Sequence, residues 1–250
     1  MAGHSKWANI KHRKGAQDKK RGKVFTKIIK EISVAVKEAG CDLQSNPRLR
    51  SAIQNAKSVN MPKDTVDRAI NKASGVDAEN YLEVTYEGYA PHGIAIFIEC
   101  TTDNINRTVA DVRAIFNKSG GELGKNGSIE FLFERKGVFV IKLNSIELNI
   151  EDFEMELIDF GLEDMERDDE HVTISCSFDN FGIMQDKLTS LNIKLNSSSI
   201  QRVATDLKAL KIDDAIQILN MIDRFEDHDD VQQVFHNLQI TEDLILELNK

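Results

Sequence analysis

The chain has 250 residues, of which 41% are hydrophobic and 29% charged, and its net charge is −9. Its three cysteines lie far apart, which excludes a disulfide framework and a zinc cluster and favours reduced thiols. No apolar run has the length of a membrane span and no secretory signal opens the chain, so a cytoplasmic globular protein with two or three domains is expected.

The charge is divided unevenly along the chain. Residues 1–75 hold 17 Lys and Arg against 6 Asp and Glu, or +11, whereas residues 76–250 hold 15 against 35, or −20. A basic segment ahead of an acidic body favours a nucleic-acid partner, because basic side chains release counter-ions from a phosphate backbone. The alternative is a solvated terminus, since blocks of like charge are often disordered tails.

Basic residues are densest before residue 28, where only Asp18 opposes them. Trp7 has two alternative roles: stacking on an exposed base, or anchoring the segment by burying its ring. Anchoring is the more frequent role of an aromatic side chain. His4 and His12 can donate to phosphate but have no metal-ligand partner at a useful spacing. The residues expected to contact nucleic acid are Lys6, Trp7, Lys11, His12, Arg13, Lys14, Lys19, Lys20, Arg21, Lys23, Lys27 and Lys30.

A helix is predicted from Lys23 to Gly40. Its apolar residues recur at helical spacing on one face, and its lysines fall on the opposite face, which is either a phosphate-binding or an ordinary solvated surface. The apolar residues are Phe25, Ile28, Ile29, Ile32 and Val36, and the lysines are Lys23, Lys27, Lys30 and Lys37.

Two shorter helices are predicted next. Asn46 and Pro47 form an N-cap and first-turn pair for the second helix, and the third follows Met61-Pro62 and stops at Ser74-Gly75. Three short amphipathic helices can close a small bundle, so residues 1–75 are expected to form a basic helical domain.

After residue 75 the apolar pattern alternates, which predicts strands mixed with helices and hence an α+β fold. Strands are expected at 81–87, 93–100, 129–134, 137–142, 171–177, 198–204 and 231–236. Helices are expected around 109–116, capped by Thr102 or Asp103, and at 151–160, 181–191 and 212–225.

A glycine-rich loop at 119–128 resembles a phosphate-binding loop only superficially. Its glycine spacing is one residue short, Asn126 replaces the hydroxyl that would hold magnesium, and the loop follows a helix. A second nucleic-acid contact surface is an alternative use, and tight turns with an internal Arg107 ion pair are the other. The candidates for that surface are Asn104, Asn106, Arg107, Gly120, Gly121 and Lys125.

The acidic run at 226–230 lacks the glycine-bearing loop of a calcium site and is expected to end a helix and form a turn. No serine, cysteine or histidine lies in a recognised nucleophile motif, and no helix-turn-helix with a base-reading helix is recognisable. We therefore expect no enzyme, no metal and no cofactor.

Several motifs resemble those of the YebC/PmpR family, whose members include a mitochondrial translational activator of cytochrome c oxidase subunit I. The motifs are Gly3-His4-Ser5-Lys6-Trp7, Ile10-Lys11, His12-Arg13-Lys14-Gly15-Ala16-Gln17-Asp18, Phe25-Thr26-Lys27, Tyr86-Glu87-Gly88-Tyr89, Thr102-Asp103-Asn104, Asn106-Arg107-Thr108, Gly120-Gly121, Leu123-Gly124, Gly127-Ser128, Glu226-Asp227 and Asp229-Asp230-Val231-Gln232. They span essentially the full length.

The resemblance implies three domains: residues 1–75, a second α+β domain at 76–137 and 205–250, and a ferredoxin-like α+β domain at 138–204 inserted into the second. It also implies a DNA-binding regulator of transcription. The alternative is a ribosome-associated translation factor that binds ribosomal RNA and assists synthesis through difficult stretches, such as proline-rich ones. Either way the expected partner is nucleic acid, without a membrane or a small-molecule substrate.

Overall fold

A computed structural model describes residues 17–75 and 78–248, which form two compact units. Of the described residues, unit 1 contains those up to Lys30, 79–134 and 203–248, and unit 2 contains 31–75, 78 and 135–202. Each unit holds a four-stranded sheet with helices, which confirms the α+β class. Residues 31–75 group with 135–202 by their contacts, and the three-domain boundaries stay a prediction.

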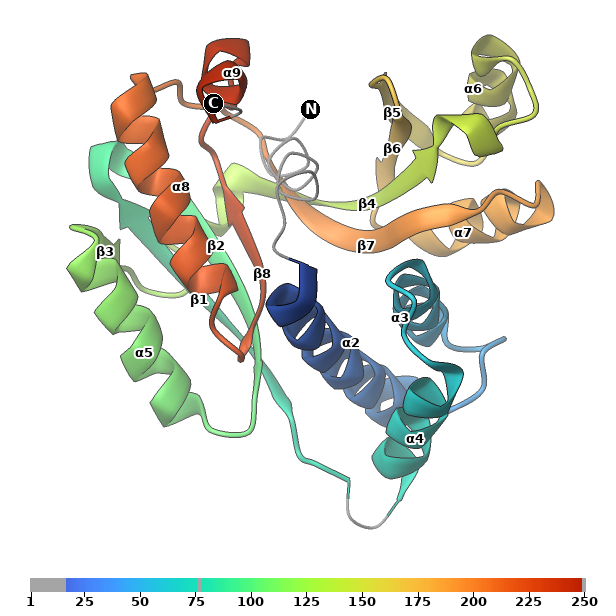
Figure 1. Cartoon of the computed structure of the whole chain (residues 1–250), viewed down its shortest axis with the longest axis horizontal. Helices are drawn as coiled ribbons and strands as arrows, with labels where there is room; N and C mark the ends of the chain where they lie inside the picture. Colours follow the sequence, from blue (N-terminus) through green and yellow to red (C-terminus); the bar gives the residue numbers. More distant parts are fainter. Residues whose placement is uncertain (1–16, 76–77, 249–250) are drawn as a thin grey trace. The chain divides into compact units, whose positions relative to one another are not determined.

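The first three helices of the described chain are α2 (Gln17–Ala39), α3 (Pro47–Ser58) and α4 (Lys63–Ser74) (Figure 1). Helix α2 starts earlier than the predicted Lys23. Gly40 follows it with a φ of +79°, the left-handed conformation that glycine tolerates best. The Asn46 Oδ1 accepts a 2.9 Å hydrogen bond from the Leu49 backbone N–H, which confirms the predicted cap.

The sheet of unit 1 has the order β3-β1-β2-β8, formed by Glu122–Leu123, Leu82–Ala90, Ile94–Thr102 and Val231–His236. Strands β1 and β2 form an antiparallel hairpin around Pro91–Gly93, and β8 pairs with β2 in the antiparallel sense. Helices α5 (Ile105–Lys118) and α8 (Ile212–Glu226) lie side by side over one face of this sheet (Figure 1), and α9 (Glu242–Leu248) follows β8.

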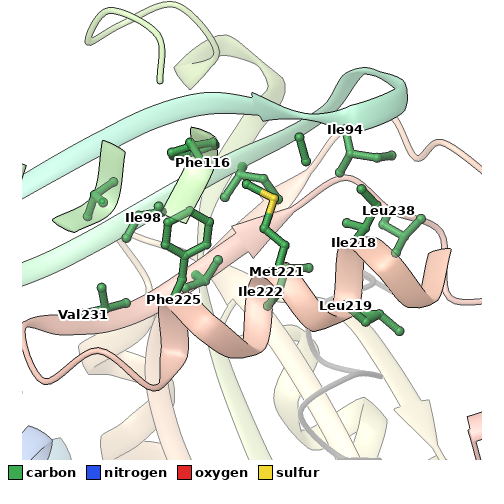
Figure 2. Close-up of a cluster of buried hydrophobic side chains, with 14 of the residues drawn as sticks. Ile94, Ile98, Phe116, Ile218, Leu219, Met221, Ile222, Phe225, Val231 and Leu238 are labelled. Atoms are coloured by element: carbon green, nitrogen blue, oxygen red, sulfur yellow. The ribbon is translucent and has the colours of Figure 1, made fainter. Parts of the chain in front are cut away.

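Strand β2 is buried on both faces, which explains its continuous apolar run. Ile94, Ile96 and Ile98 point toward α5 and α8, where Phe116 and Phe225 pack with ring centroids 4.9 Å apart. Figure 2 shows α8 side chains, among them Met221 and Ile222, directed at the strands. Ala95 and Phe97 belong to a second cluster on the other face, with Ile129, Phe133 and Phe235. This two-sided packing makes β2 the centre of unit 1.

The sheet of unit 2 has the order β5-β6-β4-β7, formed by Leu162–Arg167, His171–Ser177, Phe133–Lys142 and Leu195–Ala204. Helix α6 (Ile150–Ile158) lies between β4 and β5 in sequence, and α7 (Phe181–Ser190) between β6 and β7. The βαββαβ order with this strand arrangement is ferredoxin-like, as expected. Because the segment falls between α5 and α8, it is an insertion into unit 1.

Strand β4 differs from its prediction. Two strands were expected at 129–134 and 137–142, but the structure has a 3-10 turn at Glu130–Leu132 and one continuous strand from Phe133. Gly137 was expected to begin the second strand, but it lies inside β4, where it pairs with Cys176 of β6. The Phe181 ring lies close to it, and an added Cβ would meet Phe181 Cδ2 at 2.7 Å. Strands β3 and β5 and helix α9 were not predicted from the sequence. Strand β5 gave a weak signal because most of its residues are charged and its apolar and polar residues alternate poorly.

Helix α3 makes polar contacts with strand β7 and with helix α7 within unit 2. The Asn55 side chain donates to the Ser198 carbonyl at 2.9 Å and accepts from the Ser198 N–H at 3.0 Å, so it pairs with the backbone of edge strand β7. Gln185 donates to the Ser51 hydroxyl at 2.9 Å.

Among the residues that the structure describes, none of the helices combines the length and the apolar character that a membrane span needs.

Candidate nucleic-acid interface

The predicted contact residues fall into three groups. Lys6, Trp7, Lys11, His12, Arg13 and Lys14 lie outside the described residues. Lys19, Lys20 and Arg21 belong to the first turns of α2, where the backbone is described. Only Lys23, Lys27 and Lys30 have described side chains, and the structure places all three against one short segment of unit 1.

That segment is the turn Glu226–Asp230 between α8 and β8, called the acidic turn below. The three lysines follow each other at i, i+4 and i+7, so they share one face of α2. The Lys23 ammonium donates to the Asp227 carbonyl at 2.7 Å, Lys27 to the Glu226 carbonyl at 3.0 Å, and Lys30 to the Asp229 carbonyl at 2.8 Å. The C-terminal end of α8 carries a partial negative charge, which adds to this attraction.

Lys30 was expected on the cationic outer face of the helix, and this expectation is wrong. Its side chain is 8% exposed, and its Nζ lies 2.8 Å from Asp230 Oδ1 and 3.1 Å from the Thr101 carbonyl oxygen. An ammonium with three acceptors in a buried site has no donor left for phosphate. Lys30 therefore holds α2 within unit 1 rather than binding a ligand.

Asp230 is the centre of a buried polar network. Its Oδ1 accepts from Lys30, and its Oδ2 accepts from Arg107 and from the Thr108 hydroxyl, both at 2.9 Å, and from the Thr102 hydroxyl at 3.2 Å. Burial alone would raise the pKa of Asp230, but the bonds from Arg107, Lys30 and Thr108 hold it far below its ordinary range. The carboxylate is thus fully paired.

The start of α5 has internal partners as well. Asn104 is its N-cap and accepts from the Arg107 N–H at 3.1 Å, a place that was predicted for Thr102 or Asp103. The Arg107 guanidinium contacts Asp103 at 2.7 Å in addition to Asp230, and these hydrogen bonds raise its pKa. Arg107 was a candidate for the second contact surface, and the structure favours the internal ion pair.

The glycine amides of the glycine-rich loop have acceptors inside the protein and do not form a phosphate cradle. The buried Glu87 carboxylate accepts from the Gly127 N–H at 2.6 Å and from the Ile129 N–H at 2.8 Å. Gly120 and Gly121 donate to carbonyls at the end of α5, at 3.2 and 2.9 Å. These contacts explain the glycines as residues of tight turns. Of the other candidates for the second contact surface, Asn106 and Lys125 are exposed.

The cysteines and acidic residues show no reactive arrangement in the described chain. Cys100 and Cys176 are buried, and burial raises the pKa of each thiol to about 12, so both are protonated at neutral pH. Cys41 is exposed. No cluster of three or more His, Cys, Asp or Glu suitable for a metal occurs among the residues that the structure describes.

The roles of Asp230 and Glu87 were not predicted from the sequence. Both were visible only as members of motifs, and no spacing rule connects Glu87 with a loop forty residues later. One signal was present for Asp230: an acidic run at 226–230 complements a lysine face at i, i+4 and i+7. Pairing the two would have required knowing that β8 lies beside β2.

Comparison with known proteins covers nearly the whole chain. Residues 5–76 match the model described as the TACO1/YebC protein N-terminal domain, and residues 81–238 match the TACO1/YebC second and third domain. A crystal structure of a conserved hypothetical protein from Aquifex aeolicus superposes with a TM-score of 0.82 at 37% identity, over 92% of this chain and 95% of that one.

Curated relatives give the same result. A protein of Amoebophilus asiaticus is 50% identical over 95% of this chain and 98% of its own, and one of Acinetobacter baylyi is 45% identical over the full length of both. A third, from Geobacillus kaustophilus, is 46% identical over 95% and 97%. Each is named a probable transcriptional regulatory protein. With both domain models matched and relatives this similar, the chain belongs to the TACO1/YebC family.

Proposed function

We propose that the protein is a non-enzymatic, DNA-binding regulator of transcription that contacts the phosphate backbone through its basic N-terminal segment. The observation that carries the proposal is the charge of residues 1–75, which is +11 ahead of a body of −20. The proposed contacts are Lys6, Trp7, Lys11, His12, Arg13, Lys14, Lys19, Lys20, Arg21, Lys23 and Lys27.

The contacts of α2 support a graded role for its lysines. Lys23 is 41% exposed and pairs with Asp227, which is 68% exposed, so water and phosphate can compete for this pair at little cost. Lys27 is half-buried and already bonded to the acidic turn. Lys30 is left out of the proposed set because it is buried. The anchored part of α2 thus gives the preceding Lys19, Lys20 and Arg21 a fixed base.

A ribosome-associated translation factor that binds ribosomal RNA is the second candidate. The proposed contacts are almost all lysine and arginine, which position a protein on phosphate and carry little base-sequence information. Such contacts suit RNA recognised by shape and backbone as well as duplex DNA.

A salt titration of binding to duplex DNA tests the phosphate contact. If about six phosphates are neutralised, the slope of log affinity against log salt is about −5. Replacing Lys11, Arg13, Lys14, Lys19, Lys20 and Arg21 with Gln should abolish most binding and flatten the slope. Unchanged affinity in this variant would exclude the segment as the contact.

A matched variant controls for net charge. Six exposed basic residues lie outside the proposed set, and changing all six to Gln removes the same number of positive charges as the first variant. They are Lys118, Lys142, Lys194, Lys208, Lys211 and Arg224. We expect this variant to bind nearly as tightly as the unchanged protein. Equal losses in the two variants would mean that net charge alone, and not a defined segment, governs binding.

Crosslinking in cells followed by sequencing of the attached DNA and RNA separates the two candidates. Enrichment of promoter fragments supports regulation of transcription, and recovery of ribosomal RNA supports the translation factor. Sedimentation with ribosomes gives an independent measurement of the second outcome. The variant with six glutamines in the basic N-terminal segment is its control.

A further inference from the structure

Helix α6 of unit 2 keeps large apolar side chains outside the core. Phe153 and Leu157 are buried against the sheet, whereas Met155 is 66% and Ile158 56% exposed. Leu148, just before the helix, is 44% exposed. An amphipathic surface helix normally places polar residues at such positions, so this apolar surface calls for an explanation.

Two of the exposed apolar side chains, Leu148 and Met155, border a hollow of about 440 Å³, called the α6 groove below. It is lined by Leu148, Asp152, Met155, Glu156, Asp159 and Phe160. Asp152, Met155 and Glu156 follow each other at i, i+3 and i+4 on one face of α6, and Asp159, the C-cap, continues that face at i+7. Ligand sites in proteins span about 300–1,000 Å³, which makes this hollow large enough for one or two big apolar side chains.

The groove is acidic as well as apolar. Residues 146–170 hold twelve Asp and Glu and a single basic residue, Arg167, a net charge of −11. The Glu156 carboxylate accepts from Lys187 at 2.6 Å, and the Lys187 ammonium lies 4.5 Å from the centre of the Phe160 ring. Within the described chain, no basic side chain pairs with Asp159. This charge repels nucleic acid and attracts a cationic partner.

We propose that the α6 groove binds a short basic amphipathic helix of a partner protein. One apolar side chain of the partner would occupy the hollow between Leu148, Met155 and Phe160, and its lysines or arginines would face Asp152 and Asp159. This is the helix-in-groove mode, in which apolar anchors at helical spacing supply affinity and charge supplies orientation. The inference does not depend on the proposed nucleic-acid contact.

A second copy of unit 2 fits less well, because it carries the same acidic surface. The chemistry of the groove therefore favours a protein whose exposed helices or tails are rich in lysine and arginine. Such a surface would let the chain contact protein and nucleic acid through separate parts of its sequence.

The test uses the full chain labelled with ¹³C-methyl methionine and two synthetic 18-residue peptides. One peptide places leucine at i, i+3, i+4 and i+7 with lysine elsewhere, and the other has the same composition with its leucines spread around the helix. We expect the first to shift the Met155 methyl signal while the buried Met221 signal stays in place, and to bind at least tenfold more tightly than the second.

Two pairs of variants make the result specific. Met155→Ser and Asp159→Asn should each weaken binding of the first peptide about tenfold. Ile183→Ser, on α7, and Glu154→Gln, on α6 but outside the groove, remove a similar exposed group and should change it less than twofold.

Three outcomes would overturn the proposal. Equal affinity for the two peptides would show mere charge attraction, and equal losses in all four variants would show that the groove is not the binding site. A Met155 signal that shifts with protein concentration in the absence of peptide would make a second copy of the chain the occupant.

Discussion

Asp230 joins two segments that are distant from it and from each other in the sequence: α2 through Lys30, and the stretch from the end of β2 to the start of α5 through Thr102, Arg107 and Thr108. A buried charge pair contributes little net stability compared with an apolar pair of the same shape, but removing one partner leaves the other charge buried and unpaired. The value of this network therefore lies in fixing α2 at one place in unit 1.

Asp230→Asn tests this role. Lys30 stays buried but loses its counter-charge, so the free energy of unfolding should fall by about 3 kcal/mol or more. Asp227→Asn is the matched control, because it removes an exposed ion pair to Lys23 and should cost less than about 1 kcal/mol. Urea denaturation of both variants measures the difference, and equal losses would contradict the proposed role of burial.

The same carboxylate predicts a pH dependence. The pKa of Asp230 is lower in the folded protein than in the unfolded chain, where aspartate has a pKa of about 3.9. Between these two values the unfolded chain binds the additional proton, so stability rises with pH. The contribution is fully present above about pH 5, where the carboxyl is ionised in both states, and is lost as pH falls through the unfolded value toward the folded one.

Unfolding free energies of the unchanged protein and Asp230→Asn, measured from pH 7 to pH 3, check this expectation. The difference between the two should be constant above about pH 5 and shrink as pH falls below about 4. A difference that stays the same down to pH 3 would mean that the stabilisation by Asp230 does not depend on its charge.

At the scale of elements, the parts that could be predicted from sequence are those with local signals. The Asn46-Pro47 start of α3, the Gly40 end of α2 and the apolar spacing of α8 each rest on residues within one element. Strand β4 and the Asp230 network could not be predicted in this way, because their cause is contact between distant segments. Gly137 shows the difference most directly.

Gly137 looks like a strand end in the sequence, and the structure makes it a packing site. A Cβ there would meet Phe181 Cδ2 at 2.7 Å and Cys176 Sγ at 2.8 Å. Gly137→Ala should therefore destabilise unit 2 by about 1–3 kcal/mol through overpacking.

Gly182→Ala is the control for this substitution. Gly182 lies in the first turn of α7, and a Cβ there meets nothing within 4 Å, so alanine should be neutral or stabilising by up to about 1 kcal/mol. Thermal unfolding of the two variants compares them directly. If Gly137→Ala proved as stable as Gly182→Ala, the close passage of Phe181 would not be what keeps glycine in the strand.

At the scale of the whole molecule, a basic segment, residues 1–75, precedes an acidic body, residues 76–250. Only the basic segment is proposed to bind phosphate. We expect the charges of the body, which act over the Debye length of about 10 Å at 0.1 M salt, to repel a polyanion and so to weaken contacts that do not involve the basic segment. On this proposal, the acidity of the body favours contact through the basic segment.

Neutralising part of the body tests this idea. Changing Glu147, Glu154, Asp164, Asp169 and Glu170, all exposed, to their amides should raise affinity for non-specific DNA several-fold at low salt. The gain should disappear at high salt, because screening removes the repulsion that the carboxylates supplied. Exchanging Asp and Glu at the same five positions keeps the charge and should leave affinity unchanged. If the amide variant bound no better than this control at low salt, the acidity of the body would play no part in directing the approach of nucleic acid.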